Sequence, residues 1–180
     1  AAERACEILD KKSKNHVEVN SSSLDKILSR FDKIRNSSGD IRTAELRDKM
    51  QRAMQRYAPV YRDEETLQNG IDIMKNNFND FNNLSVSDKS LIWNTDLVES
   101  LELNNLLYQS LATLYSAYNR TESRGSHARE DYPDRDDKDW LKHTMVWVSE
   151  DGDSKFDYKP VELKTLTDEV ETVALKARTY

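Results

Sequence analysis

The sequence predicts a mainly α-helical fold, in which an antiparallel three-helix bundle is preceded by a short helix and followed by a C-terminal β-hairpin plus an extended tail. Two observations support this expectation. Apolar residues recur every three or four positions in several separate stretches, which is typical of amphipathic helices. Strand-forming residues then gather on both sides of a Glu-Asp-Gly-Asp sequence at 150–153, which is typical of a hairpin.

Two helices are expected ahead of the bundle. The first is short and covers Ala1–Lys12, with Ile8 and Leu9 on its apolar side. The three serines at 21–23 can cap the second helix, because a side-chain hydroxyl can accept a hydrogen bond from a free N–H group of the first turn. The apolar face of the second helix follows at spacings of three and four, and comprises Leu24, Ile27, Leu28, Phe31 and Ile34.

The bundle itself is expected to contain three helices. Asp40 is a candidate cap for the first helix, and Pro59 ends it because proline has no N–H group to donate. Asp63–Glu65 places carboxylates in the first turn of the second helix, where the helix dipole favours negative charge. The third helix runs from about 96 to 118, and its wide apolar face predicts that it lies at the centre of the bundle.

The hairpin is expected from two short segments that are rich in strand formers, His143–Val148 and Phe156–Pro160. Glu150–Asp153 lies between them and has the composition of a turn. The tail that follows, from 161 to 180, shows neither the period of a helix nor that of a strand.

Composition and charge exclude several classes of function. The 180 residues contain 27 Lys and Arg against 33 Asp and Glu, and the resulting net charge of −6 argues against nucleic-acid binding, which needs a basic face. The four glycines stand far apart, so the chain carries no glycine-rich loop for a dinucleotide. The single cysteine excludes an internal disulfide, and no apolar run approaches the ~20 residues that a membrane span needs.

The polar segment 119–139 is the candidate functional region. Its arginines alternate with carboxylates and are Arg120, Arg124, Arg129 and Arg135. Two interpretations stay open: a solvated loop whose charges neutralise one another, or a docking loop whose arginines clamp carboxylates through paired N–H groups. His127 would need an orienting partner to act as a general base, and Glu122 or Asp131 could serve as one, but a structural or interface role is favoured. No set of His, Cys, Asp and Glu has the spacing of metal ligands.

The run Arg120–Asp137, which reads RTESRGSHAREDYPDRDD, resembles the flavoprotein family of succinate dehydrogenases and fumarate reductases. Trp140–Thr144 continues the likeness, and Arg47–Met50 and Leu101–Leu106 occur upstream in the order of the family. Ala177–Tyr180 is similar to the C-terminus of these subunits. The resemblance covers most of the chain, and the SRGSHARED portion with its RDD extension is specific to this group.

The resemblance implies how the chain is divided. Residues 1–38 correspond to the end of an FAD-binding domain and a linker helix, 39–118 to the helical bundle, and 119–180 to the Arg-rich loop, the hairpin and the tail. The chain starts without methionine and inside a predicted helix, so we expect a fragment of a longer polypeptide. No residue matches the family's catalytic or flavin-binding motifs, so no catalytic, cofactor-binding or metal residue is expected, and the FAD of the parent protein is not expected to bind this fragment.

The resemblance also implies a function. The parent protein would oxidise succinate to fumarate through FAD and pass electrons to an iron–sulfur subunit and quinone. This fragment would be a structural and docking domain, inactive alone, with Arg124, His127 and Arg129 as the candidate docking loop. Its partners would be the FAD-binding domain of the same subunit and the iron–sulfur subunit, without nucleic acid.

Membrane association would be indirect, through anchor subunits, at the cytoplasmic face of a bacterial inner membrane or the matrix face of a mitochondrial one. Two alternatives remain at this point. The parent could be a fumarate reductase, which runs the same chemistry in the opposite direction, or the chain could be a helical interaction module without an enzymatic parent.

Overall fold

The computed structural model describes residues 2–11, 20–165, 167 and 169–176. Five α-helices, one short 3-10 helix and small strands account for the regular structure of this part of the chain, so the prediction of a mainly helical fold is confirmed. The residues at 177–180 that resemble the family's C-terminus, and the first and last residues of the predicted first helix, lie outside the described residues.

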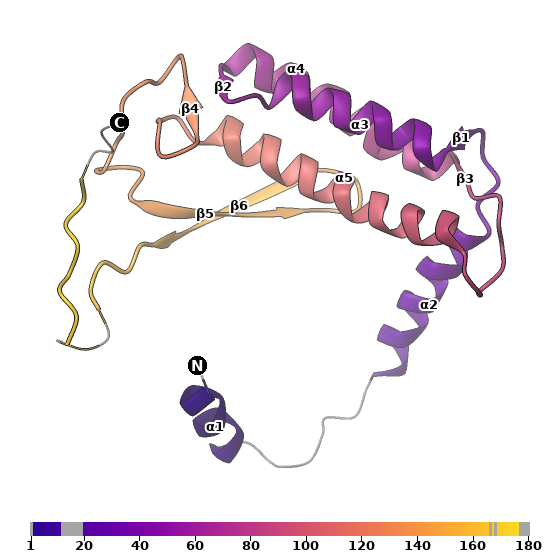
Figure 1. Ribbon diagram of the computed structural model, residues 1–180, viewed down its shortest axis with the longest axis horizontal. Coiled ribbons are helices and arrows are strands. Elements are labelled where there is room, and N and C mark those ends of the chain that lie inside the picture. Colours follow the sequence, from indigo (N-terminus) through magenta and orange to yellow (C-terminus); the bar gives the residue numbers. More distant parts are fainter. Residues whose placement is uncertain (1, 12–19, 166, 168, 177–180) are drawn as a thin grey trace.

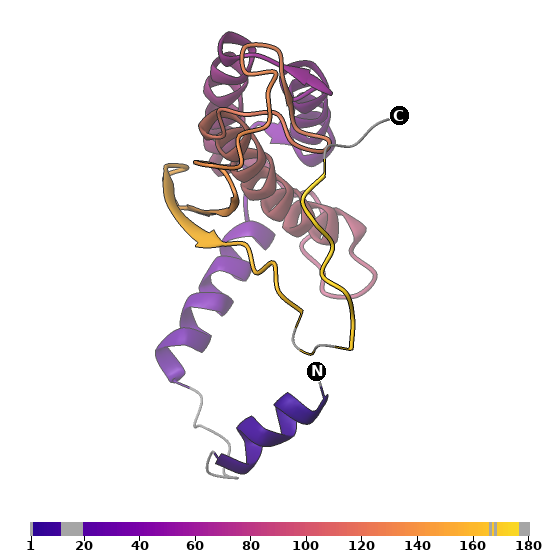
Figure 2. The same ribbon diagram turned by 90° about the vertical axis from the view of Figure 1, so that its left-hand side faces the viewer.

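The first two helices differ in how they meet the other three, because the second contacts the last of those three and buries Ile34, whereas the side chains of the first are exposed where they are described. Helix α1 covers Ala2–Lys11 and α2 covers Ser21–Arg35, and both lie below the remaining helices in Figure 2. The expected serine cap of α2 is wrong, because the serines lie inside its first turn. Asn20 is the cap instead, and its Oδ1 accepts a hydrogen bond of 3.0 Å from the N–H group of Ser22.

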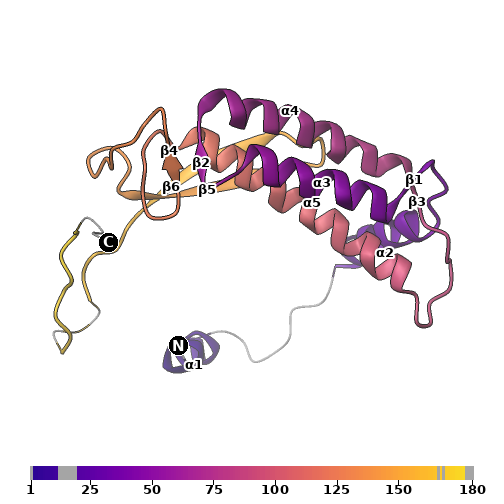
Figure 3. The same ribbon diagram turned by 45° about the horizontal axis from the view of Figure 1, so that its top comes forward.

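Three longer helices pack together and hold the core. They are α3 (Thr43–Tyr57), α4 (Glu64–Asp80) and α5 (Thr95–Asn119). Figures 1 and 3 show α3 and α4 side by side, with α5 running along both. The core side chains that α5 buries completely are Leu103, Leu107, Leu111 and Leu114. Because these leucines face more than one neighbouring element, α5 lies at the centre, as its wide apolar face predicts.

The starts of α4 and α5 are set by side-chain caps. Asp63 Oδ1 accepts from the N–H group of Thr66 at 2.8 Å, and Asn94 Oδ1 accepts from that of Leu97 at 2.8 Å. Each bond satisfies a donor that the helix leaves free in its first turn. No such bond begins α3, so the expectation that Asp40 caps it is wrong.

A short parallel pairing takes the place of a cap before α3. Strand β1 (Ile41–Arg42) pairs with β3 (Leu84–Ser85), which follows the 3-10 helix η1 (Phe81–Asn83). This pairing brings the chain that leaves α4 alongside the chain that enters α3. The hydroxyl of Thr43, the first residue of α3, then lies 2.8 Å from that of Ser100 on α5.

Two strands near the C-terminus cover another side of α5. Strands β5 (Lys142–Val148) and β6 (Ser154–Pro160) pair antiparallel along their whole length, and β5 contacts α5. Gly152 in the connecting turn has φ 78°, and a Cβ atom there would lie 3.2 Å from the ring of Phe78. The turn is held by Tyr115, whose hydroxyl donates to the Gly152 carbonyl at 2.8 Å.

Candidate functional site

The Arg-rich segment after α5 is an ordered cluster of ion pairs. A tight turn shapes its first part: the N–H groups of Arg124 and His127 donate to each other's carbonyl oxygens at 2.8 and 3.1 Å. Gly125 occupies this turn with φ 59°, a conformation that other residues adopt with strain. Strand β4 (Ala128–Arg129) follows and pairs parallel with β2 (Tyr61–Arg62), so the segment is fastened to the chain that enters α4.

The carboxylate of Glu122 is the centre of the cluster. Its side chain is completely buried, and it accepts 2.8 Å bonds from Arg120 Nε, Arg124 Nε and the N–H group of Asp136. Burial by itself acts to raise the pKa of Glu122, but the bonds from Arg124, the Asp136 N–H group and Arg120 hold it below the ordinary value. Glu122 is therefore an ionised group that joins both ends of the loop.

Arg129 ties the same loop to two helix ends. Its guanidinium donates to both carboxylate oxygens of Asp131 at 2.7 and 2.6 Å, and its Nη1 donates to the carbonyls of Ala117 and Tyr118 at 3.0 Å. Those carbonyls lie in the last turn of α5, where the dipole favours a cation. Asp131 also accepts from the N–H group of Glu64, the first residue of α4, at 3.0 Å.

This arrangement fixes the position of α5 relative to α4 through one buried guanidinium. The Arg129 side chain is only 1% exposed, and its bonds to Asp131 hold the pKa of that carboxyl below its ordinary range. Arg129 is thus a buried residue that links α5 to α4. The Arg124 side chain, in contrast, keeps 27% of its surface exposed and also contacts Asp137 at 2.8 Å.

His127 is half-buried among arginines and is neutral. Its Nδ1 lies 3.1 Å from Arg62 Nη1, and its Nε2 lies 3.1 Å from the Arg120 carbonyl oxygen. A guanidinium can only donate and a carbonyl can only accept, so Nδ1 accepts and the proton is on Nε2. Burial, followed by the charges of Arg62 and Arg129, lowers the pKa of His127. Both ring nitrogens of His127 are thus engaged, Nδ1 by Arg62 and Nε2 by the Arg120 carbonyl, so the side chain links the loop to the chain before α4 and to the end of α5.

A second group of contacts joins the cluster to the strands. Arg120 Nη1 donates to the Lys142 carbonyl at 3.0 Å, and its guanidinium lies 5.2 Å from the ring centre of Trp140. The Lys142 ammonium lies 4.1 Å from the ring centre of Tyr158 on β6. Cation–aromatic contacts of this kind hold the start of β5 against the loop.

The structure brings all three sequence-predicted site residues into this cluster. From the sequence, Glu122 and Asp131 are candidates to orient His127, but in the structure they bind Arg124 and Arg129 instead. Arg62, which does contact His127, is not indicated by the sequence. The signal for the two acid–arginine pairs was available, because each acid stands two residues from the arginine that it binds. The contact with Arg62 joins residues 65 positions apart, and no local spacing indicates it.

The described residues contain neither a glycine-rich phosphate loop nor a cluster of metal ligands. Gly39 and Gly70 lie against neighbouring backbone or side chains, and Gly125 and Gly152 form separate turns, so none builds a phosphate-binding loop. Within the described ranges, no three His, Cys, Asp or Glu side chains converge on a point where a metal ion could bind. None of the helices in those ranges has the length and apolar character that a membrane span requires.

Comparison with known proteins gives a consistent result. A family model described as the fumarate reductase flavoprotein C-terminal region matches residues 47–180. The succinate dehydrogenase flavoprotein subunit of Rickettsia bellii is 53% identical over 180 residues, which is all of this chain and 30% of that protein. The mitochondrial succinate dehydrogenase [ubiquinone] flavoprotein subunit of Oryza sativa is 43% identical over 157 residues, 87% of this chain and 25% of that protein.

Solved structures agree with these relatives. A quinol-fumarate reductase with menaquinol molecules superimposes with a TM-score of 0.81 at 32% identity, over 92% of this chain and 29% of that one. A variant of the E. coli quinol fumarate reductase gives 0.77 at 31% identity, over 84% and 27%. This chain therefore spans about 30% of the length of the Rickettsia relative, and it belongs to the family formed by the C-terminal region of fumarate reductase and succinate dehydrogenase flavoproteins.

Proposed function

We propose that this chain is the structural and docking region of a flavoprotein that oxidises succinate to fumarate through FAD. The electrons pass to an iron–sulfur subunit and then to quinone. The observation that carries this proposal is the family match over 47–180 together with 53% identity to a succinate dehydrogenase flavoprotein subunit. A parent that runs as a fumarate reductase is the second candidate, because the family model and the solved relatives carry that name. The non-enzymatic interaction module is the least supported alternative.

The residues of this chain would contribute rigidity to that reaction. Residues 39–118 act as a three-helix bundle, and residues 119–180 add the Arg-rich loop, the hairpin and the tail. Residues 1–38 are the end of the FAD-binding domain and a linker helix. FAD supplies the hydride acceptor in the parent protein, and no residue of this chain is assigned to its binding or to catalysis.

The Arg-rich loop is the proposed docking element. Glu122 and Arg129 fix its backbone from inside, and the Arg124 side chain keeps 27% of its surface exposed. A loop that is held in place before binding loses little conformational entropy when a partner arrives. The partners proposed for it are the FAD-binding domain of the same subunit and the iron–sulfur subunit, and attachment to the membrane, at its cytoplasmic or matrix face, is indirect through anchor subunits.

The test uses the assembled enzyme. Arg124→Gln is compared with Arg135→Gln, a matched change at a loop arginine that pairs only with Asp137 among the described residues. We expect Arg124→Gln to reduce both co-purification of the iron–sulfur subunit and succinate-dependent dye reduction, with Arg135→Gln close to wild type. Wild-type values for Arg124→Gln in both measurements would show that the loop is solvated surface and does not dock.

A further inference from the structure

Three consecutive apolar side chains project from the loop that precedes α5. Leu91, Ile92 and Trp93 are 64%, 77% and 96% exposed. A tryptophan side chain has a large apolar surface, and leaving it in water forgoes the stabilisation that its burial would give. Exposed aromatic side chains of this kind are typical of the residues that dominate protein interfaces.

The loop holds these side chains in place by hydrogen bonds on both sides. Asn94 Nδ2 donates to the carbonyls of Asp88 and Ser90 at 2.7 and 2.9 Å. The carboxylate of Asp96 accepts from the N–H and hydroxyl groups of Ser87 at 2.6 and 2.8 Å. The exposure of the apolar side chains is therefore built into the fold and does not come from a loose loop.

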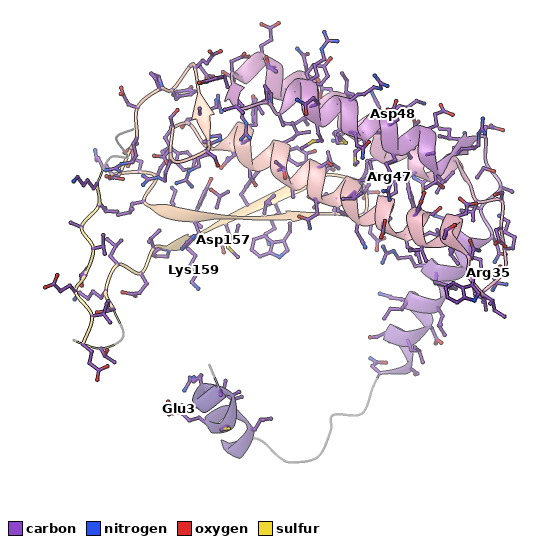
Figure 4. All side chains as sticks on the ribbon, in the orientation of Figure 1. Glu3, Arg35, Arg47, Asp48, Asp157 and Lys159 are labelled. Carbon is purple, nitrogen blue, oxygen red and sulfur yellow. The ribbon has the colours of Figure 1, made fainter. Side chains whose placement is uncertain are left out.

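A contact with the end of α2 also holds the loop, and the backbone of Trp93 is strained. Arg35, labelled in Figure 4, donates from its Nε to the Lys89 carbonyl at 2.7 Å and fastens the loop to α2. Trp93 has φ 54°, which places a bulky residue in the left-handed region that it rarely adopts. Strain of this kind persists when the surrounding contacts impose it, and it is found preferentially at functional positions.

The exposed tryptophan belongs to a larger apolar surface, here called the Trp93 surface. It combines one face of α2 with the loop and the first turn of α5, and consists of Leu24, Leu28, Phe31, Leu91, Trp93 and Val98. Leu24, Leu28 and Phe31 follow one another at spacings of four and three, so they share a helix face. Figure 3 shows α2 beside the start of α5, with the loop extending beyond them.

A cavity of about 550 Å³ opens in this surface, and its charge is one-sided. Among the described residues, the only charged side chains that line it are Glu99 and Glu102. Glu102 pairs with Arg47 of α3 at 3.0 Å, and Glu99 is exposed. An occupant that brings an apolar side chain and a neighbouring Lys or Arg would match both the shape and the charge.

We propose that the Trp93 surface docks the part of the flavoprotein that precedes this chain in its relatives, an inference that rests on the proposed function. A segment of that part inserts an apolar side chain beside Trp93 and places a Lys or Arg against Glu99. The relatives are about three times longer than this chain, and the C-terminal family match begins at residue 47, after α2. Half of the Trp93 surface is therefore provided by a helix that connects to the preceding region.

The acidic rim argues against a second copy of this chain as the occupant. Two copies that met through the same surface would bring Glu99 and Glu102 of one protomer toward those of the other. Like charges brought together at an interface lower its stability. The preceding region of the same polypeptide is also covalently attached, so its effective concentration at this surface is high.

The experiment uses the complete flavoprotein with p-benzoylphenylalanine in place of Leu91. After irradiation, the crosslinked peptides are identified by mass spectrometry. We expect a peptide from the region upstream of this chain, with an apolar residue beside Lys or Arg. Adding Trp93→Ala should reduce the crosslink yield about tenfold, as expected when an interface anchor is truncated. Trp147→Ala, a control at a 52% exposed tryptophan on β5, should leave the yield unchanged.

The proposal is overturned by a crosslink to the iron–sulfur subunit or to a second copy, or by the absence of any crosslink in folded protein. An equal loss of yield in the Trp93 and Trp147 variants would also overturn it. Failure of the proposed function has a separate readout, because it appears as wild-type protein that binds no FAD or does not oxidise succinate. The crosslink reports on the docking surface whichever result that assay gives.

Discussion

Replacing Glu122 by Gln tests whether the Arg-rich loop is held by one buried carboxylate. The wild-type side chain is completely buried and accepts bonds from two guanidinium groups and the N–H group of Asp136. The glutamine amide has nearly the same shape, but it leaves Arg120 and Arg124 without the negative charge that both approach. Breaking a buried ion pair from one side costs about 3–5 kcal/mol.

We expect Glu122→Gln to lower the free energy of unfolding by about 3 kcal/mol, the lower end of that range, because the amide oxygen can still accept one hydrogen bond. The assay is urea unfolding of the chain at pH 7, followed by circular dichroism at 222 nm. Glu130→Gln is the control, since Glu130 lies in the same loop but is exposed, and such surface changes usually alter stability by about 0.5 kcal/mol or less. A loss below about 1 kcal/mol for Glu122→Gln would refute the reasoning.

The pH dependence gives an independent check on the same residue. The pKa of Glu122 is lower in the folded chain than its ordinary value of 4.5. The stability that its charge contributes is therefore present above that ordinary value and is lost as the pH falls through the folded-state pKa. The difference in unfolding free energy between wild type and Glu122→Gln should shrink below pH 4.5, whereas a constant difference would contradict the assignment.

Two further predictions concern the core and the histidine. A Cβ atom at Gly70 would lie 2.6 Å from Tyr57 Cβ and 2.9 Å from Leu114 Cδ2. Gly70→Ala should therefore destabilise the chain by about 1–3 kcal/mol in urea unfolding. An unchanged unfolding midpoint would contradict this contact. The folded-state pKa of His127 lies below its ordinary 6.5. Stability should therefore fall as the pH drops below 6.5, because the unfolded chain binds the proton first. His127→Gln should remove that slope, and His143→Gln, at an exposed histidine, should retain it.

The helices could be predicted because their signals are local. The gaps between Leu67, Ile71, Met74 and Phe78 match one helix face, and all four are buried in the core. Two predicted caps are wrong, the serines at 21–23 and Asp40, and the second depends on contacts that local spacing does not determine. Asp40 has the right chemistry for a cap, but the pairing of β1 with β3 keeps that stretch of chain extended, so the helix starts at Thr43. That pairing joins residues 43 positions apart, and no local rule contains it.

The sequence by itself determined the helical class, the central place of α5, the location of the candidate region and, through one motif, the family. These depend on the order of residues along the chain, which the sequence displays directly. Only the tertiary structure decided what the charged side chains do, because Arg124 and Arg129 look alike in a sequence while one reaches the surface and the other is buried against the end of α5. The energy of a charge depends on its burial and its partners, and those are fixed only when distant segments meet.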